Sequence, residues 1–169
     1  DFTGERPMIV KDPRICRMVP LWRGVAARLG VGLRVVLAYR HPAEVVASLA
    51  RRDAMPQDAA ALAWLRHVLD AERETRDLPR VVVDYAELLE DWRGQVERIA
   101  AGLGIPFMSS GVAAVQADAF VSPALRRESA AGRAAEPLPA WLTEAMEALC
   151  DLRHDPFDPC AMRRLTDLD

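Results

Sequence analysis

Residues 35–42 read Val-Val-Leu-Ala-Tyr-Arg-His-Pro, and this stretch decides the fold. Its first four residues form a continuous apolar run, which is typical of a parallel strand covered on both faces. Pro42 then stands at a favourable first position for a helix. Apolar side chains recur at helical spacing after it, at Val45, Val46 and Leu49. The stretch therefore predicts a buried strand that passes directly into an amphipathic helix.

The same alternation extends along the chain in both directions. Short apolar runs at residues 8–10 and 81–83 predict two further strands. Amphipathic periodicity predicts further helices over residues 20–29, 56–75, 92–103 and 139–152. Strands that alternate with helices imply right-handed crossovers, so the predicted fold class is α/β, a parallel sheet flanked by helices.

Two of these helices have informative faces. Leu21, Val25 and Leu29 share one face of the first. In the helix over residues 56–75 the apolar side chains turn inward, and Glu72 and Arg76 are spaced to pair on the outside.

Length and composition limit the class of protein. The chain has 169 residues and 18.7 kDa, which suits one domain over residues 1–169. A formal net charge of -3 gives no overall field that would attract nucleic acid. No apolar segment has the length of a membrane span, and the first residues lack the basic and apolar regions expected of a signal peptide. With three widely spaced cysteines, these features predict a cytoplasmic protein with reduced thiols.

Lys11 is the one lysine among 22 basic residues. Codon bias accounts for an excess of arginine wherever a positive charge is enough. The lysine that remains indicates a position that needs an ammonium group, a point charge on a flexible stem.

Polar side chains follow each predicted strand. Lys11 and Asp12 follow the first strand, Arg40 follows the second, and Tyr85 follows the third. Because ligands bind beyond the carboxyl ends of parallel strands, these side chains should meet at one rim. Helical spacing places Ser48 on the side of the following helix that should face this rim. A phosphate would meet Arg40, Ser48 and helix N-terminal amides there; the alternative is an arginine and a serine on an ordinary surface.

Residues 40–48, Arg-His-Pro-Ala-Glu-Val-Val-Ala-Ser, resemble a signature of the sulfotransferases that use 3'-phosphoadenosine 5'-phosphosulfate (PAPS). The resemblance implies that Arg40 and Ser48 bind the 3'-phosphate. Residues 81–89 are similar to the family's strand and Tyr-Glu-Asp-Leu segment, which would make Tyr85 an adenine contact; the alternative is a tyrosine that ends a strand and packs on the next helix. The implied fold is P-loop NTPase-like. The resemblance is good over residues 1–105 and loose over residues 106–169, a loop-rich and helical part.

Residues 11–14 resemble the Lys-Asp-Pro-Arg segment of bacterial sulfotransferase-like proteins. By this resemblance Lys11 faces the bridging oxygen or the sulfuryl group and stabilises charge on the leaving phosphate. Pro13 stands where cytosolic members carry a histidine, so the usual general base is absent. Asp12 is the remaining candidate base, but an aspartate beside Lys11 and Arg14 should have a low pKa and orient these cations instead.

Residues 120–127 resemble the late loop of the family. This implies that Phe120 stacks on adenine and that Arg126 and Arg127 reach the 3'-phosphate; a solvated arginine pair is the alternative. No metal site is expected, because the cysteines and histidines lack ligand spacing.

The Gly-rich phosphate loop of the family is not in the sequence. We therefore expect an N-terminally incomplete sulfotransferase that binds PAPS or its product PAP and is inactive as these 169 residues alone. The complete enzyme would transfer a sulfuryl group to a hydroxyl or amine of a small-molecule or glycan acceptor. Two alternatives stay open, a nucleotide-binding module without catalysis and a P-loop kinase-like phosphotransferase.

Overall fold

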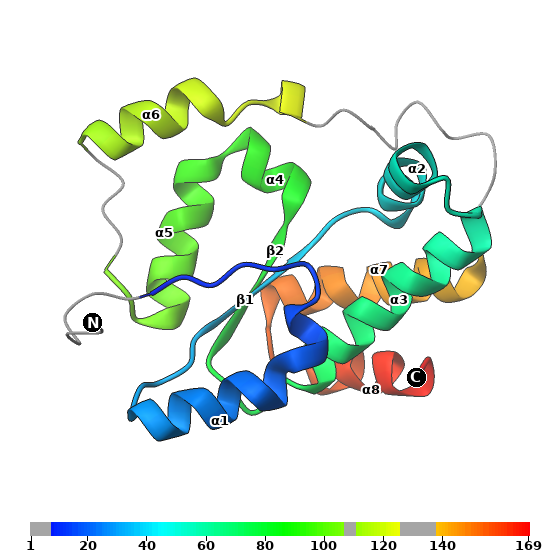
Figure 1. The fold of residues 1–169 in the computed structure, drawn as a ribbon, viewed down its shortest axis with the longest axis horizontal. Coiled ribbons are helices and arrows are strands. Elements are labelled where there is room, and N and C mark those ends of the chain that lie inside the picture. Colours follow the sequence, from blue (N-terminus) through cyan, green and yellow to red (C-terminus); the bar gives the residue numbers. More distant parts are fainter. Residues whose placement is uncertain (1–7, 107–110, 126–137) are drawn as a thin grey trace.

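The computed structural model describes residues 8–106, 111–125 and 138–169. Within them two strands, β1 (Val35–Tyr39) and β2 (Arg80–Asp84), pair in parallel with Val36 opposite Val81 (Figure 1). Helices make up most of the remaining described structure. The predicted α/β class is therefore confirmed in its coarser form, as a mostly helical protein with a small parallel sheet.

Helices connect and flank the strands. The chain passes from β1 to β2 through α2 (Pro42–Asp53) and α3 (Gln57–Arg73), and β2 runs directly into α4 (Tyr85–Glu90) and then α5 (Trp92–Leu103). The other described helices are η1 (Ile15–Met18), α1 (Val19–Leu29), α6 (Val112–Phe120), η2 (Pro123–Leu125), α7 (Ala140–His154) and α8 (Pro159–Asp167). All the predicted helices are present, whereas the sequence pattern did not predict α4, α6 and α8.

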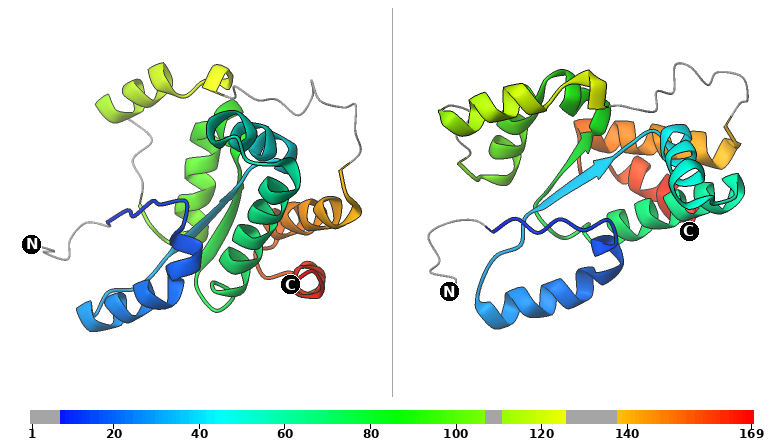
Figure 2. Two further views of the ribbon diagram at one scale, coloured as in Figure 1. Left: turned by 45° about the vertical axis from the view of Figure 1, so that its right-hand side comes forward. Right: turned by 45° about the horizontal axis from the view of Figure 1, so that its top comes forward.

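The main core lies on the face of the sheet that carries Leu37 and Tyr39. Trp64 of α3 and Leu149 of α7 are buried against this face. Figure 2 shows α3 and α7 on one side of the strands and α5 on the other. Because α7 and α5 cover its two faces, β2 is buried nearly throughout. In β1, however, Val36 is 45% exposed, so the prediction that this strand is covered on both faces is wrong.

Arg80, at the start of β2, belongs to a buried ion-pair network. Its Nη2 lies 3.1 Å from Oε1 of Glu72, and both side chains are fully buried. Arg80 Nη2 also donates to the carbonyl of Pro156 at 2.6 Å. Arg76 donates to the same carboxylate at 2.6 Å and to the carbonyl of Met162 at 3.0 Å. The predicted Glu72–Arg76 pair is confirmed, but its expected place on the outside is wrong for Glu72, because the C-terminal segment covers it.

The apolar run at residues 8–10 does not form the predicted strand. Its side chains are exposed, and the chain over residues 8–14 crosses the line of β1 in Figure 1 just before it reaches η1. Pairing in a sheet requires two segments to run alongside each other, which this segment does not do here. α1 similarly buries Ala26 but leaves Leu21, Val25 and Leu29 exposed.

Candidate functional site

The carboxyl ends of β1 and β2 bring Arg40 and Tyr85 together. Arg40 is the first residue after β1, and Tyr85 is the first residue of α4, directly after β2. The Arg40 guanidinium carbon lies 5.2 Å from the centre of the Tyr85 ring, in cation–π range. This contact agrees with the prediction that the two side chains lie at one rim of the sheet.

The local sequence explains why Tyr85 sits at this turn. The carboxylate of Asp84 accepts a hydrogen bond of 2.7 Å from the amide of Ala86. This is an N-cap, which ends the strand and starts a helix within one residue. The cap fixes the direction in which Tyr85 leaves the sheet.

Arg40 is held at both its side chain and its backbone. Its Nε donates to Oε2 of Glu44 at 2.8 Å, and the Glu44 side chain is only 1% exposed. The indole nitrogen of Trp64 donates to the Arg40 carbonyl at 2.9 Å. The guanidinium remains partly accessible, with 25% of the side chain exposed. Arg40 is thus a positioned cation at the protein surface, with a buried carboxylate behind it.

The first turn of α2 is closed by His41. The amide of Ala43 donates to Nδ1 of His41 at 3.3 Å, and the amide of Glu44 donates to the His41 carbonyl at 3.0 Å. Helix N-terminal amides were expected to meet a phosphate here, but these two already have partners within the turn. Ser48 lies one turn beyond Glu44 on the same helix and is half-buried.

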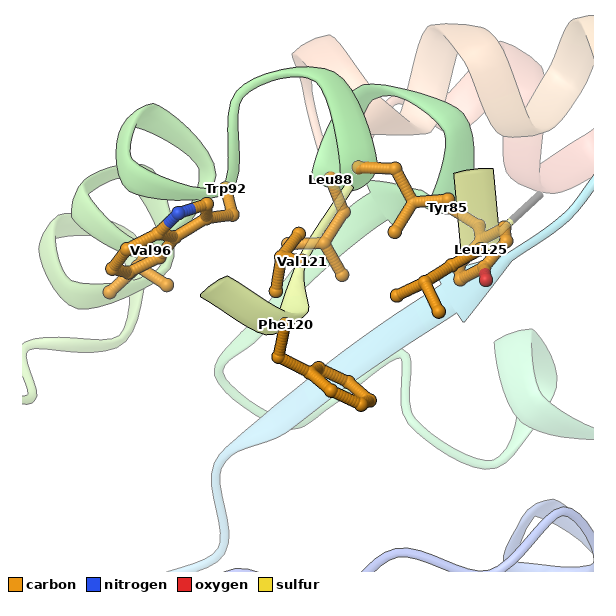
Figure 3. A pocket seen from close by; sticks show the side chains of 8 residues that line it. Tyr85, Leu88, Trp92, Val96, Phe120, Val121 and Leu125 are labelled. Atoms are coloured by element: carbon orange, nitrogen blue, oxygen red, sulfur yellow. The ribbon is translucent and has the colours of Figure 1, made fainter. Parts of the chain in front are cut away.

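Next to Tyr85 lies an apolar pocket of about 480 Å³ between α4 and α5 on one side and the end of α6 with η2 on the other (Figure 3). This volume is within the usual range for small-molecule sites. Three aromatic side chains belong to the lining, and aliphatic side chains complete it: Tyr85, Leu88, Leu89, Trp92, Val96, Phe120, Val121 and Leu125. Aromatic rings at an apolar pocket suit a flat, conjugated ligand.

A polar connection joins α6 to α5 beside the pocket. Asp118 of α6 accepts a hydrogen bond of 3.1 Å from the indole nitrogen of Trp92 and one of 2.6 Å from Nη2 of Arg93. Trp92 therefore forms pocket wall with its ring and holds α6 with its nitrogen. Phe120 follows on the same helix, and its side chain is 70% exposed although it contributes to the lining.

Lys11 and Asp12 lie in the extended segment before η1. Lys11 is exposed, and Asp12 is engaged by Arg14, whose amide donates at 2.8 Å and whose Nε donates at 3.1 Å to Oδ1 of Asp12. These hydrogen bonds lower the pKa of Asp12 to about 2. The expected ion pairing of Asp12 is present, and such a carboxylate is a weak base. Arg126 and Arg127 lie outside the described residues.

Sequence reasoning missed several residues of the site. Glu44 stands four residues after Arg40, a spacing that signals an ion pair across the start of α2. Trp92 is the first residue of the amphipathic helix predicted over residues 92–103, and nothing local showed that α6 would lie against it. The lining residues from α6 and η2 required the tertiary structure.

Other kinds of site receive no support in the described ranges. There, no cluster of three histidine, cysteine or acidic side chains could hold a metal ion. Nor does any helix in these ranges have both the length and the apolar character needed to cross a membrane.

The fold and site define an α/β protein with an arginine-flanked aromatic pocket at the carboxyl end of its sheet. Comparison with protein-family models, with curated proteins and with solved structures finds no match to the chain.

Proposed function

We propose that the chain binds an adenosine 3',5'-bisphosphate nucleotide, PAP or PAPS, and forms the nucleotide-holding part of a sulfotransferase. The observation that carries the proposal is the double role of Tyr85. Its ring lies 5.2 Å from the guanidinium of Arg40 and also lines the apolar pocket. A base-sized apolar space and a cation for a phosphate are thus adjacent, as a nucleotide requires.

The base would enter the pocket. Tyr85 and Trp92 offer ring surfaces there, and Leu88 and Leu125 offer aliphatic ones. Stacking of a nucleic-acid base on an aromatic side chain is worth about 1–3 kcal/mol. The exposed Phe120 can close over the base from α6, which agrees with the role that the family resemblance implies for it.

The 3'-phosphate would bind at Arg40. Guanidinium groups bind phosphate through short, charge-assisted hydrogen bonds. Glu44 orients the guanidinium through Nε but adds a negative charge nearby. A phosphate therefore has to lie closer to the Arg40 guanidinium than to the Glu44 carboxylate for the attraction to exceed the repulsion. Ser48, farther along α2, is the proposed hydroxyl donor.

Titration calorimetry with PAP tests the proposal. We expect Arg40→Ala and Tyr85→Ala each to raise Kd by about tenfold or more, because each removes a contact worth about 1.5 kcal/mol or more. Arg52→Ala is the matched control, since it removes the same charge from an exposed position near the end of α2. An unchanged Kd in Arg40→Ala, or an equal loss in Arg52→Ala, contradicts the phosphate site.

In the complete enzyme, the acceptor oxygen or nitrogen would attack the sulfur while the bond from sulfur to the 5'-phosphate oxygen breaks. PAP would leave, and the acceptor would lose its proton to a base. Lys11 is the proposed electrostatic stabiliser of the leaving phosphate.

A second candidate function is nucleotide binding without transfer, and the state of Asp12 favours it. Arg14 holds this carboxylate, whose pKa of about 2 makes it a poor proton acceptor. Because these 169 residues alone are expected to be inactive, the chain extended by an upstream Gly-rich phosphate loop is incubated with PAPS and mixed phenol and amine acceptors to distinguish the two. PAP release that depends on acceptor supports transfer, whereas PAP binding without release supports the module.

A further inference from the structure

Three exposed apolar sets lie close together in the sequence. The extended residues Met8, Ile9 and Val10 are 55%, 75% and 38% exposed. The second set is the face of α1 with Leu21, Val25 and Leu29, and the third is the outer face of β1 at Val36. Exposing all three in one small domain is costly, since apolar surface contributes to stability only when it leaves water.

β1 also has a backbone edge without a strand beside it in the described ranges. The amide of Val35 donates to the carbonyl of Pro79 across the β1–β2 pair at 2.9 Å. Alternate residues of a strand point their backbone groups to opposite edges, so those of Val36 and Ala38 point away from β2. This edge can accept one more parallel strand.

We propose that residues 8–10 dock against this edge of β1 as a third parallel strand in a conformation distinct from the one described. Residues 8–10, α1 and β1 would then form a β-α-β unit. A right-handed crossover into β1 places α1 on the same face of the sheet as α3. The described structure already has this arrangement: η1 contacts α3, and Arg23 of α1 donates to Asp77 just beyond α3 at 2.8 Å.

Docking would cover the open backbone edge of β1 and part of the exposed face of α1 together. The strand pairs the free backbone groups of Val36 and Ala38, and its inward side chains cover the exposed face of α1 at Leu21 and Val25. It would also carry Lys11 to the carboxyl end of the sheet, where Arg40 lies. Docking of this segment would therefore bring Lys11 and Arg40 to the same end of the sheet, as the sequence pattern predicts.

Amide hydrogen exchange of the whole chain, followed residue by residue by NMR, tests the proposal without any nucleotide. The outcome is therefore independent of the proposed function. We expect the amides of Val36 and Ala38 to exchange at least about tenfold more slowly than an unprotected chain. Ile9→Asp should abolish this protection, because a charged residue opposes packing of the docked strand. Val115→Asp is the matched control, since Val115 of α6 is similarly exposed at 67% and lies outside the unit.

Three results would overturn the proposal. The first is unprotected Val36 and Ala38 amides in the unmodified chain. The second is protection that persists in Ile9→Asp, with unchanged helical circular dichroism showing that the variant is folded. The third is protection that rises with protein concentration, which would mean that a second copy occupies the edge.

Discussion

The indole nitrogen of Trp92 donates a hydrogen bond of 3.1 Å to Oδ1 of Asp118, which joins α5 to α6 beside the apolar pocket. Arg93 reinforces the same carboxylate through its Nη2 at 2.6 Å. A single exposed aspartate therefore accepts from two consecutive residues of α5. The position of α6, and with it Phe120 and Val121, depends on this connection.

Asp118→Ala should loosen α6 without unfolding the protein. The interactions are exposed, so we expect a loss of about 1 kcal/mol or less in the free energy of unfolding. Amides of α6 should exchange faster, because the helix loses its polar connection to α5. Exchange measured by NMR or mass spectrometry checks this. Asp53→Ala, which removes an exposed ion pair with Arg52, is the control and should leave α6 exchange unchanged.

Glu72→Ala should be among the most destabilising single substitutions. It leaves the guanidinium of Arg80 buried without its carboxylate partner, and burial already lowers the pKa of that guanidinium. Breaking such a pair costs about 3–5 kcal/mol. Urea unfolding measures the loss. Asp77→Ala removes the exposed partner of Arg23 and should change the free energy of unfolding far less, so similar losses in the two variants would contradict the assigned burial.

The carboxyl group of Asp77 should titrate with a pKa of about 2. A side-chain hydrogen bond from Arg23 lowers this pKa from 3.8. Since the folded-state pKa lies below the unfolded value, the ion pair stabilises the fold above pH 4, and this contribution disappears as the pH falls through about 2. Carboxyl carbon shifts in NMR follow the titration. Arg23→Ala should return the midpoint toward 3.8, and an unchanged midpoint would show that Arg23 is not the cause.

Gly102→Ala should destabilise the packing of α5 on β2. A Cβ at this position would lie 2.5 Å from Cγ2 of Val81, which is too close for two carbon atoms. The resulting shift should cost about 1–3 kcal/mol. Gly24→Ala in α1 is the control, since a Cβ there meets no atom within 4 Å and alanine favours a helix by about 1 kcal/mol. Because Gly102 also lies within a helix, the same preference offsets part of its clash. The melting temperature should rise in Gly24→Ala and be clearly lower in Gly102→Ala than in Gly24→Ala.

The sequence predicted the elements better than their surroundings. The apolar runs in β1 and β2 and the 3.6-residue periodicity of α3 and α5 are local signals, and the structure has these elements where they were expected. Contact between Arg40 and Tyr85 was also predictable, because both follow parallel strands directly. The contact between Trp92 and Asp118 could not be predicted, because the two residues are far apart in the sequence and no local pattern shows that α5 and α6 pack together.

Two residues show that local sequence patterns did not predict burial correctly. Periodicity placed Glu72 away from the apolar face of its helix, yet the side chain is completely buried, because the C-terminal segment and α8 cover that side. Ile9 belongs to an apolar run that predicts a buried strand, yet it is 75% exposed.

The sequence by itself determined β1, β2, the helices α1, α2, α3, α5 and α7, and the polar residues that follow the two strands, because backbone preference and side-chain period act within one segment. Only the tertiary structure decided which faces are covered, that Glu72 is paired inside with Arg80, and that Tyr85 borders a pocket closed by α6. Burial depends on contacts between segments far apart in the chain, and local patterns show that a face is apolar without showing what covers it.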